Sequence, residues 1–333
     1  MTEATVINES CQQTAWSGGV SFYPTIDTFA KLKTQLDEWA RFTLSDLDAI
    51  GCLQVLPTST FSNGVLTCRY SLNRKEGLAY GWGRYFGQTG NGPTSTAGFG
   101  ATGKCALIVP GSGLNQADAI IANTGYQNIL YNPVCTIGDG IVHVLPGCDF
   151  RLLAGTNGKG YLRDAINNYL LDHGSSLALL EIIEACALLK WMQVAYSLNP
   201  AWPLYTKRAV LGLSDGAYHA MIAGLLMSPD AAVCASGISL ATKAQGYGLA
   251  GNNVIPGIYG RFDQAQIVSG IQNSPAKWLF SKSTVDDIAI LLHENATGYT
   301  QSLLNFSNVT HTTHSTGHKY PPNLGTWLAS ALA

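Results

Sequence analysis

The sequence predicts an α/β protein in which a mostly parallel central sheet is flanked by helices. Short apolar runs with strand character alternate with longer helical segments beyond residue 100, as expected when helices connect parallel strands. A Gly-x-Ser-x-Gly motif lies between one such run and a helical segment. An acid and a histidine follow later predicted strands, so the three side chains are expected to meet at one edge of the sheet.

The first hundred residues, 1–100, are expected to form an N-terminal helix and antiparallel strands that lead into the sheet. Apolar residues recur at helical spacing over 25–48, which indicates an amphipathic helix. Residues 52–70 and 78–86 alternate as strands do, and Asn63-Gly64 is a signal for a hairpin turn.

The rest of the chain supplies the strands and helices of the sheet, and we interpret 1–333 as a single domain. Its predicted strands are 105–109, 141–145, 208–211, 231–236, 276–281 and 302–309. Its predicted helices are 114–122, two within 160–198, 217–227, 288–295 and one from about residue 323. Residues 239–275 are rich in Gly and Gln without periodicity, and we expect them to form a cap or a pocket wall.

Ser214 is the candidate nucleophile. It lies in Gly212-Leu213-Ser214-Asp215-Gly216, after the predicted strand and before the predicted helix. This arrangement is typical of a sharp turn that lifts a serine hydroxyl clear of the sheet. Gly212 and Gly216 then let the strand and the helix approach each other.

Asp286 is the candidate acid, because it follows the predicted strand 276–281 within a short loop. A carboxylate there can accept the Nδ1–H of an imidazole and hold its tautomer. Asp287 is the alternative. One of the two aspartates would then cap the following helix.

His318 is the candidate general base, since Gly317-His318 lies between the predicted last strand and the terminal helix. His311 and His314 are placed in the same loop and remain alternatives. A metal site is not favoured, because no cysteine or acid accompanies these histidines at ligand spacing. His143, in a strand, is interpreted as a core residue. His219 lies one helical turn after Ser214, and we do not favour it as the base because the helix would carry its side chain away from the reaction face.

Two backbone donors are expected to hold the oxyanion of a tetrahedral intermediate. One is the N–H of Asp215, which follows the nucleophile. The other comes from Ser112 or Gly113, in the glycine-rich loop after strand 105–109. The same loop is also consistent with an ordinary turn between a strand and a helix.

Over residues 103–333 the chain resembles the α/β-hydrolase superfamily, and most closely its polyhydroxybutyrate-depolymerase and feruloyl-esterase-like branch. The segment 210–237 and the loop 110–113 carry the resemblance. Pro110 stands where many relatives have histidine, and Asp215 replaces a small or bulky neutral residue. The resemblance implies a serine hydrolase with Ser214, Asp286 and His318 as its triad and with no cofactor.

Composition excludes some other functions. Apolar residues make up 46% of the chain, charged residues 12%, and the net charge is −2, so a packed core is expected and nucleic-acid binding is not. The longest apolar stretch, 177–195, contains Glu181, Glu184 and Lys190 on one helical stripe. We therefore predict a helix with a polar face rather than a membrane span.

Localisation is not fixed by the sequence. Residues 1–11 contain acids and no apolar core, so they do not read as a secretory signal. Low charge and abundant small polar residues favour an extracellular or virion-associated protein. Asn295, Asn305 and Asn308 begin glycosylation sequons. Cysteines in apolar runs are expected to be buried thiols: Cys105, Cys186 and Cys234. Cys52 with Cys68, and Cys135 with Cys148, could form disulfides in an exported protein, and the sequence does not decide between bridged and free thiols. It does not determine the oligomeric state either.

The function predicted from these observations is carboxylic-ester hydrolysis through an acyl-enzyme. The glycine-rich stretch 239–275 lacks the long apolar helix of a lipase lid, which favours short acyl groups, acetyl above all, on a bulky or polymeric alcohol. The alternatives are a polyester or feruloyl esterase, a serine peptidase of the same fold, and a catalytically silent binding or virion-structural domain.

Overall fold

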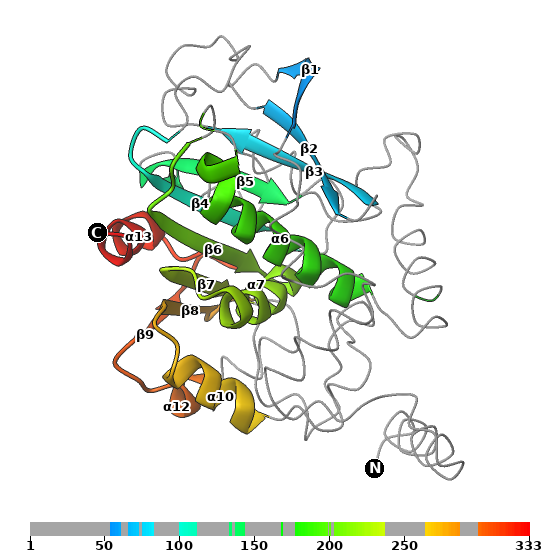
Figure 1. Ribbon diagram of the computed structural model, residues 1–333. Coiled ribbons are helices and arrows are strands. Elements are labelled where there is room, and N and C mark those ends of the chain that lie inside the picture. Colours follow the sequence, from blue (N-terminus) through cyan, green and yellow to red (C-terminus); the bar gives the residue numbers. More distant parts are fainter. Residues whose placement is uncertain are drawn as a thin grey trace.

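A computed structural model describes the parts of the chain that build the central sheet and its helices (Figure 1). The described residues are 54–60, 66–72, 75–82, 100–111, 133–134, 137–143, 168, 177–198, 200, 203–236, 264–286 and 299–333. The predicted helix 25–48, the turn at Asn63-Gly64 and the predicted helices 114–122 and 288–295 lie outside them.

Nine strands of the described part form one sheet, in the order β1-β2-β3-β5-β4-β6-β7-β8-β9. Their bounds are β1 Gln54–Thr60, β2 Leu66–Leu72, β3 Lys75–Trp82, β4 Lys104–Val109, β5 Asp139–His143, β6 Lys207–Leu213, β7 Ala231–Ala235, β8 Lys277–Ser283 and β9 Val309–His314.

The sheet has an antiparallel part and a parallel part. The antiparallel part contains the pairs β1–β2, β2–β3 and β3–β5. The parallel part contains the pairs β5–β4, β4–β6, β6–β7, β7–β8 and β8–β9. In the middle, Lys104 pairs with Lys207 and Val109 with Gly212. The predicted class, a mostly parallel sheet preceded by antiparallel strands, is confirmed.

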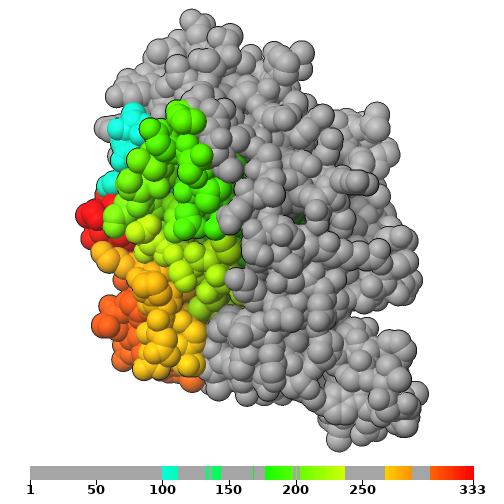
Figure 2. All heavy atoms as spheres, in the orientation of Figure 1, coloured from blue at the N-terminus to red at the C-terminus, as the bar shows by residue number. Residues whose placement is uncertain are grey.

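Helices cover both faces of this sheet. The helices of the described part are α6 Leu177–Leu198, α7 Asp215–Met227, α10 Gln264–Gln272, α12 Tyr299–Leu303 and α13 Leu324–Ala331. α6, α7 and α10 contribute to one apolar cluster, and α13 contributes to a second cluster on the opposite face (Figure 1). In the same orientation, Figure 2 shows the outer sides of α6 and α10 at the surface.

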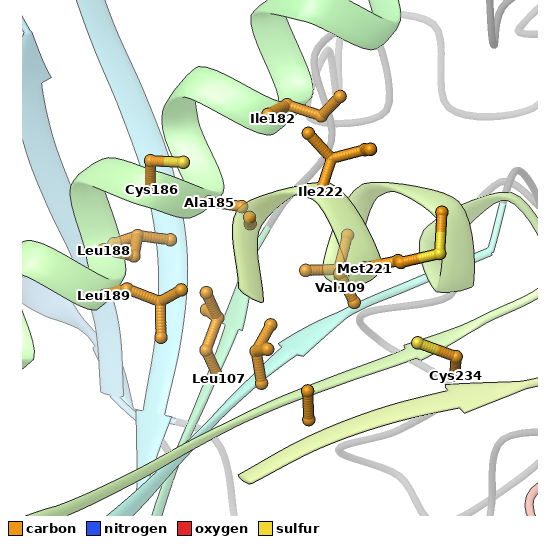
Figure 3. Packing of buried hydrophobic residues seen from close by; sticks show 14 of the residues in the cluster. Leu107, Val109, Ile182, Ala185, Cys186, Leu188, Leu189, Met221, Ile222 and Cys234 are labelled. Atoms are coloured by element: carbon orange, nitrogen blue, oxygen red, sulfur yellow. The ribbon is translucent and has the colours of Figure 1, made fainter. Parts of the chain in front are cut away.

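β4 is buried on both faces, which explains why its sequence is continuously apolar. Cys105, Leu107 and Val109 belong to the cluster under α6 and α7, while Ala106 and Ile108 belong to the cluster under α13. Figure 3 shows Leu107 and Val109 beneath side chains of the two helices, among them Ile182, Leu189 and Met221. Such two-sided burial is typical of central parallel strands.

The predicted strand 302–309 is wrong. Residues 299–303 form α12, and the last strand begins only at Val309. The apolar signal at Leu303 and Leu304 comes from packing against the cluster that includes α10, not from a strand. β9 is an edge strand composed mainly of threonines and histidines, and such a strand needs no continuous apolar run.

The polar face predicted for the helix at 177–195 was expected to face solvent, and this is wrong for its two glutamates. Glu181 and Glu184 do share a face of α6, but they are 0% and 7% exposed and lie against histidines of neighbouring elements. A buried glutamate is tolerated when a partner is supplied, and the spacing of charges alone does not reveal this. Among the helices that the structure describes, none is long and apolar enough to cross a membrane.

The three cysteines predicted to be buried thiols are buried and form no disulfide: Cys105, Cys186 and Cys234. Burial raises the pKa of the Cys105 and Cys234 thiols, so both remain protonated near neutral pH. Cys52, Cys135 and Cys148 lie outside the described residues, and only the backbone of Cys68 is described. The two suggested disulfides therefore remain predictions.

Candidate active site

Ser214 lies on a strained turn between β6 and α7. Its backbone has φ 57° and ψ −128°, a region that residues with a side chain rarely adopt. The turn is held by two backbone hydrogen bonds: the Ser214 N–H donates to Ala235 O at 3.0 Å, and the Ala217 N–H donates to Ser214 O at 2.9 Å. This local conformation is the one expected of a nucleophile elbow.

The two glycines of the motif are required by close packing. A Cβ added to Gly212 would overlap the backbone of Gly216. A Cβ added to Gly216 would overlap the carbonyl oxygens of Val109 and Pro110, at the end of β4. The elbow is therefore pressed against the start of the glycine-rich loop that follows β4.

Asp286 and His318 are in contact. The His318 Nδ1–H donates to Asp286 Oδ2 at 2.9 Å. The carboxylate is buried, with 0% of its side chain exposed, whereas 15% of the imidazole side chain is exposed. A proton on Nδ1 leaves Nε2 unprotonated in the neutral ring, which is the state a general base requires.

The loops that carry this pair are fixed at the carboxyl ends of β7 and β8. The Gly317 N–H donates to Ser283 Oγ at 3.1 Å, and the Ser236 hydroxyl donates to Lys319 O at 3.4 Å. Gly317 has φ 80°, in the left-handed region that favours glycine. Hydrogen bonds from two strands thus flank His318 in its loop.

His311 and His314 lie on β9, not in the loop where the sequence analysis placed them. The His311 Nε2–H donates to Leu304 O at 3.0 Å, and its ring stacks on Phe280. β9 extends this far because Trp278 to Ser283 of β8 pair with Val309 to His314. The ring of His311 is thus held by the Leu304 carbonyl and by packing against Phe280.

His314 is the more deeply placed of the two, with 9% exposed. Both the N–H and the hydroxyl of Thr316 lie within reach of its Nδ1, at 3.4 and 2.7 Å, so Nδ1 acts as an acceptor. Burial lowers the pKa of His314, and the nearby Asp286 carboxylate opposes this in part. The ring is therefore expected to be neutral near pH 7.

The candidate oxyanion donors are described only in part. Asp215 is the first residue of α7, so its N–H points out of the helix N-terminus, where partial positive charge favours an anion. Gly111 is the last described residue of the loop after β4. Ser112, Gly113 and the alternative acid Asp287 lie outside the described residues, as do 239–263 of the predicted pocket wall.

Two further histidine–carboxylate pairs, neither of them predicted from the sequence, lie beneath α6. His143 Nε2 is 2.6 Å from Glu184 Oε2, and His219 Nδ1 is 3.2 Å from Glu181 Oε2. Both rings are fully buried, which confirms the interpretation of His143 as a core residue. Two acids three positions apart in an otherwise apolar helix were the signal that could have indicated buried partners.

The three candidate residues follow strands that end at one edge of the sheet. Ser214 follows β6, Asp286 follows β8 and His318 follows β9, all at the carboxyl edge of parallel strands, where ligands of open α/β sheets bind. Within the described ranges, no three His, Cys, Asp or Glu side chains are grouped so that they could hold a metal ion.

Comparisons with known proteins agree with this architecture. No family model matches the sequence, and no curated protein matches it. Among solved structures, the chain is similar to an acetyl xylan esterase from Paenibacillus sp. R4, with TM-score 0.53, 14% identity and coverage of 94% of this chain and 98% of that one. It is also similar to the methylesterase BT1017, with TM-score 0.51 and 15% identity over 91% of this chain and 62% of that one. At such low identity the likeness shows the fold, which is that of the α/β-hydrolases.

Proposed function

We propose that this α/β-hydrolase-fold protein is a serine carboxylic-ester hydrolase with Ser214 as nucleophile, His318 as general base and Asp286 as orienting acid. One observation carries the proposal. A serine in a strained turn and an imidazole hydrogen-bonded through Nδ1 to a buried carboxylate share the carboxyl edge of one sheet. Along the chain the residues follow the order serine, acid, histidine, which is the order found in hydrolases with this fold.

The reaction follows from these groups. His318 Nε2 takes the hydroxyl proton while Ser214 Oγ forms a bond to the acyl carbon. The tetrahedral intermediate collapses, the bond to the alcohol oxygen breaks, and the imidazolium returns the proton to the departing alcohol. A water molecule then attacks the acyl-enzyme with the same imidazole as base, which releases the acid and restores Ser214. Asp286 stays ionised throughout and stabilises the imidazolium.

The oxyanion is assigned to backbone donors. The N–H of Asp215 belongs to a helix N-terminus and follows the nucleophile directly. The N–H of Ser112 or Gly113 is the proposed second donor. Support for this loop comes from Gly216, whose missing Cβ lets the end of β4 approach the elbow.

For the substrate we propose short acyl groups, acetyl above all, on a bulky or polymeric alcohol. The glycine-rich sequence before α10, residues 239–263, supports this, because it lacks the long apolar helix of a lipase lid. One similar structure is that of an enzyme named for acetyl xylan. A polyester or feruloyl esterase would cleave a different ester by the same reaction. A peptidase of the same fold, or a silent binding or virion-structural domain, would differ in the reaction itself.

A pair of assays tests the proposal. Wild-type protein is expected to hydrolyse p-nitrophenyl acetate with higher kcat/KM than the octanoate or decanoate, and to be labelled by a fluorophosphonate probe. Ser214→Ala should abolish both hydrolysis and labelling without loss of the fold, since losing a triad member typically costs ~10⁴-fold or more. Failure of the folded wild-type protein to react with the probe would favour the silent domain. A preference for the long esters would contradict only the substrate class.

A further inference from the structure

Ser283, the last residue of β8, joins the two loops that carry the acid and the base. Its Oγ accepts a hydrogen bond from the Val285 N–H at 3.3 Å and another from the Gly317 N–H at 3.1 Å. Val285 directly precedes Asp286, and Gly317 directly precedes His318. A single hydroxyl oxygen therefore ties together the backbone on the N-terminal side of both residues.

The surroundings make this contact a defined one. Ser283 is 1% exposed, so water does not compete freely for its oxygen. The loop is also held at Thr284, whose N–H donates to His314 O at 2.8 Å. On the other side of His318, the carbonyl of Lys319 accepts from the Ser236 hydroxyl at 3.4 Å. Ser283 is the only one of these groups that bonds to both loops.

We infer that Ser283 is a positioning residue for the acid–base pair: its hydroxyl oxygen sets the separation and angle between Asp286 and His318. The inference rests on the proposed function and deepens it. Removing the oxygen takes away the one acceptor that the partly buried N–H groups of Val285 and Gly317 share, so the two loops are expected to shift apart. A displacement of about 1 Å at reacting groups can cost on the order of 100-fold in rate.

The chain offers a matched control two residues earlier. Ser281 lies on the same strand and sheet face and is 9% exposed, and its Oγ has no hydrogen-bond partner among the described residues. Ser281→Ala and Ser283→Ala delete the same atom at neighbouring buried sites. Only the second deletion removes an acceptor shared by the two loops.

The experiment compares Ser283→Ala, Ser283→Cys and Ser283→Thr with Ser281→Ala in the full chain, using p-nitrophenyl acetate. We expect kcat to fall about 10- to 100-fold in the alanine and cysteine variants with KM within about twofold. Threonine keeps the hydroxyl and should retain most of kcat. Cysteine fills nearly the same volume as serine, so it carries the test if the alanine variant does not fold.

The second readout is the low-field ¹H NMR signal of the imidazole Nδ1 proton bonded to Asp286, which a merely structural role would leave unchanged. It should shift or broaden in Ser283→Ala and Ser283→Cys and remain as in wild type in Ser281→Ala. Ser283 variants with wild-type kcat and an unchanged signal would overturn the inference. If Ser214→Ala remains active, the proposed function itself fails, and that result is independent of any Ser283 variant.

Discussion

Histidine–carboxylate pairs occur in two regions of the described part of the chain, and the two regions differ in exposure and in the ring nitrogen that meets the acid. Beneath α6, His143 pairs with Glu184 and His219 lies beside Glu181, with both rings fully buried. At the carboxyl edge of the sheet, His318 pairs with Asp286 and keeps 15% of its side chain exposed. The pairing of an imidazole with an acid is therefore not enough to identify a base.

The ring atom that meets the acid separates the regions further. His143 uses Nε2, the nitrogen that a general base of this kind would need for the serine. His318 uses Nδ1, which leaves Nε2 available. His219 also presents Nδ1 to its acid, but its ring is 0% exposed within the core. Exposure and ring orientation together distinguish a base from a structural pair.

The largest effect is expected at His318. His318→Ala should lower kcat/KM for p-nitrophenyl acetate on the order of 10⁵-fold, because no other described imidazole is exposed with Nδ1 on a buried acid. His311→Ala should stay within about tenfold of wild type. Inactivity of folded His311→Ala, with an active His318→Ala, would assign the base to β9 and break the comparison between the two regions.

A slightly smaller loss is expected for the acid. Asp286→Asn should lower kcat about 10⁴-fold, because the amide can no longer hold the imidazole with its proton on Nδ1. Asp287→Asn should lose less than tenfold, and circular dichroism should show both variants folded. The reverse order of activities would move the acid one residue along the chain.

Beneath α6 the expected effect is on stability rather than on rate. Glu184→Ala should lower the free energy of unfolding by about 3–5 kcal/mol, because it leaves a buried imidazole without its partner. The folded fraction should keep wild-type kcat. Urea unfolding followed by fluorescence measures the first quantity and active-site titration with the probe normalises the second. A large fall in kcat per active site would mean that this pair does contribute to the reaction.

The smallest effect concerns pH and His314. Its pKa is lower in the folded protein than in the unfolded chain, because burial disfavours the imidazolium. The unfolded chain therefore binds more protons below the ordinary histidine pKa of about 6.5, and stability should fall as pH drops below that value. His314→Gln should make the decline between about pH 6.5 and 5 shallower in urea titrations at several pH values. An unchanged slope would show that His314 does not contribute to it.

Local sequence was sufficient for the sheet core and for the turn at Ser214. The apolar run of β4 and the motif around Ser214 both depend on short-range requirements, two-sided burial and a sharp turn, that the sequence displays directly. The position of β9 was predicted wrongly, because this strand is stabilised by pairing with β8 and its threonines and histidines are also typical of a loop. Because the strand lies at 309–314 rather than at 302–309, His311 and His314 belong to it and not to the loop that follows.

Tertiary partners account for what the sequence could not predict. The burial of Glu181 and Glu184 depends on histidines that come from β5 and α7, 41 positions before Glu184 in one case. Likewise, nothing around Ser283 indicates that its hydroxyl lies between Val285 and Gly317, since the second contact spans 34 residues. Long-range hydrogen bonds of this kind become visible only once the strands are placed side by side.

The position of β4 in the sheet also has a consequence for biosynthesis. β4 lies between β5 and β6, and its pairing with β6 joins residues as far apart as Lys104 and Lys207. During translation, the edge of β4 that will meet β6 therefore stays uncovered while about a hundred further residues are made. At roughly 5–20 residues per second, that interval lasts on the order of 5–20 seconds. An apolar strand with an open edge is prone to pair with other chains, so the nascent protein is most exposed to aggregation before its nucleophile turn has been synthesised.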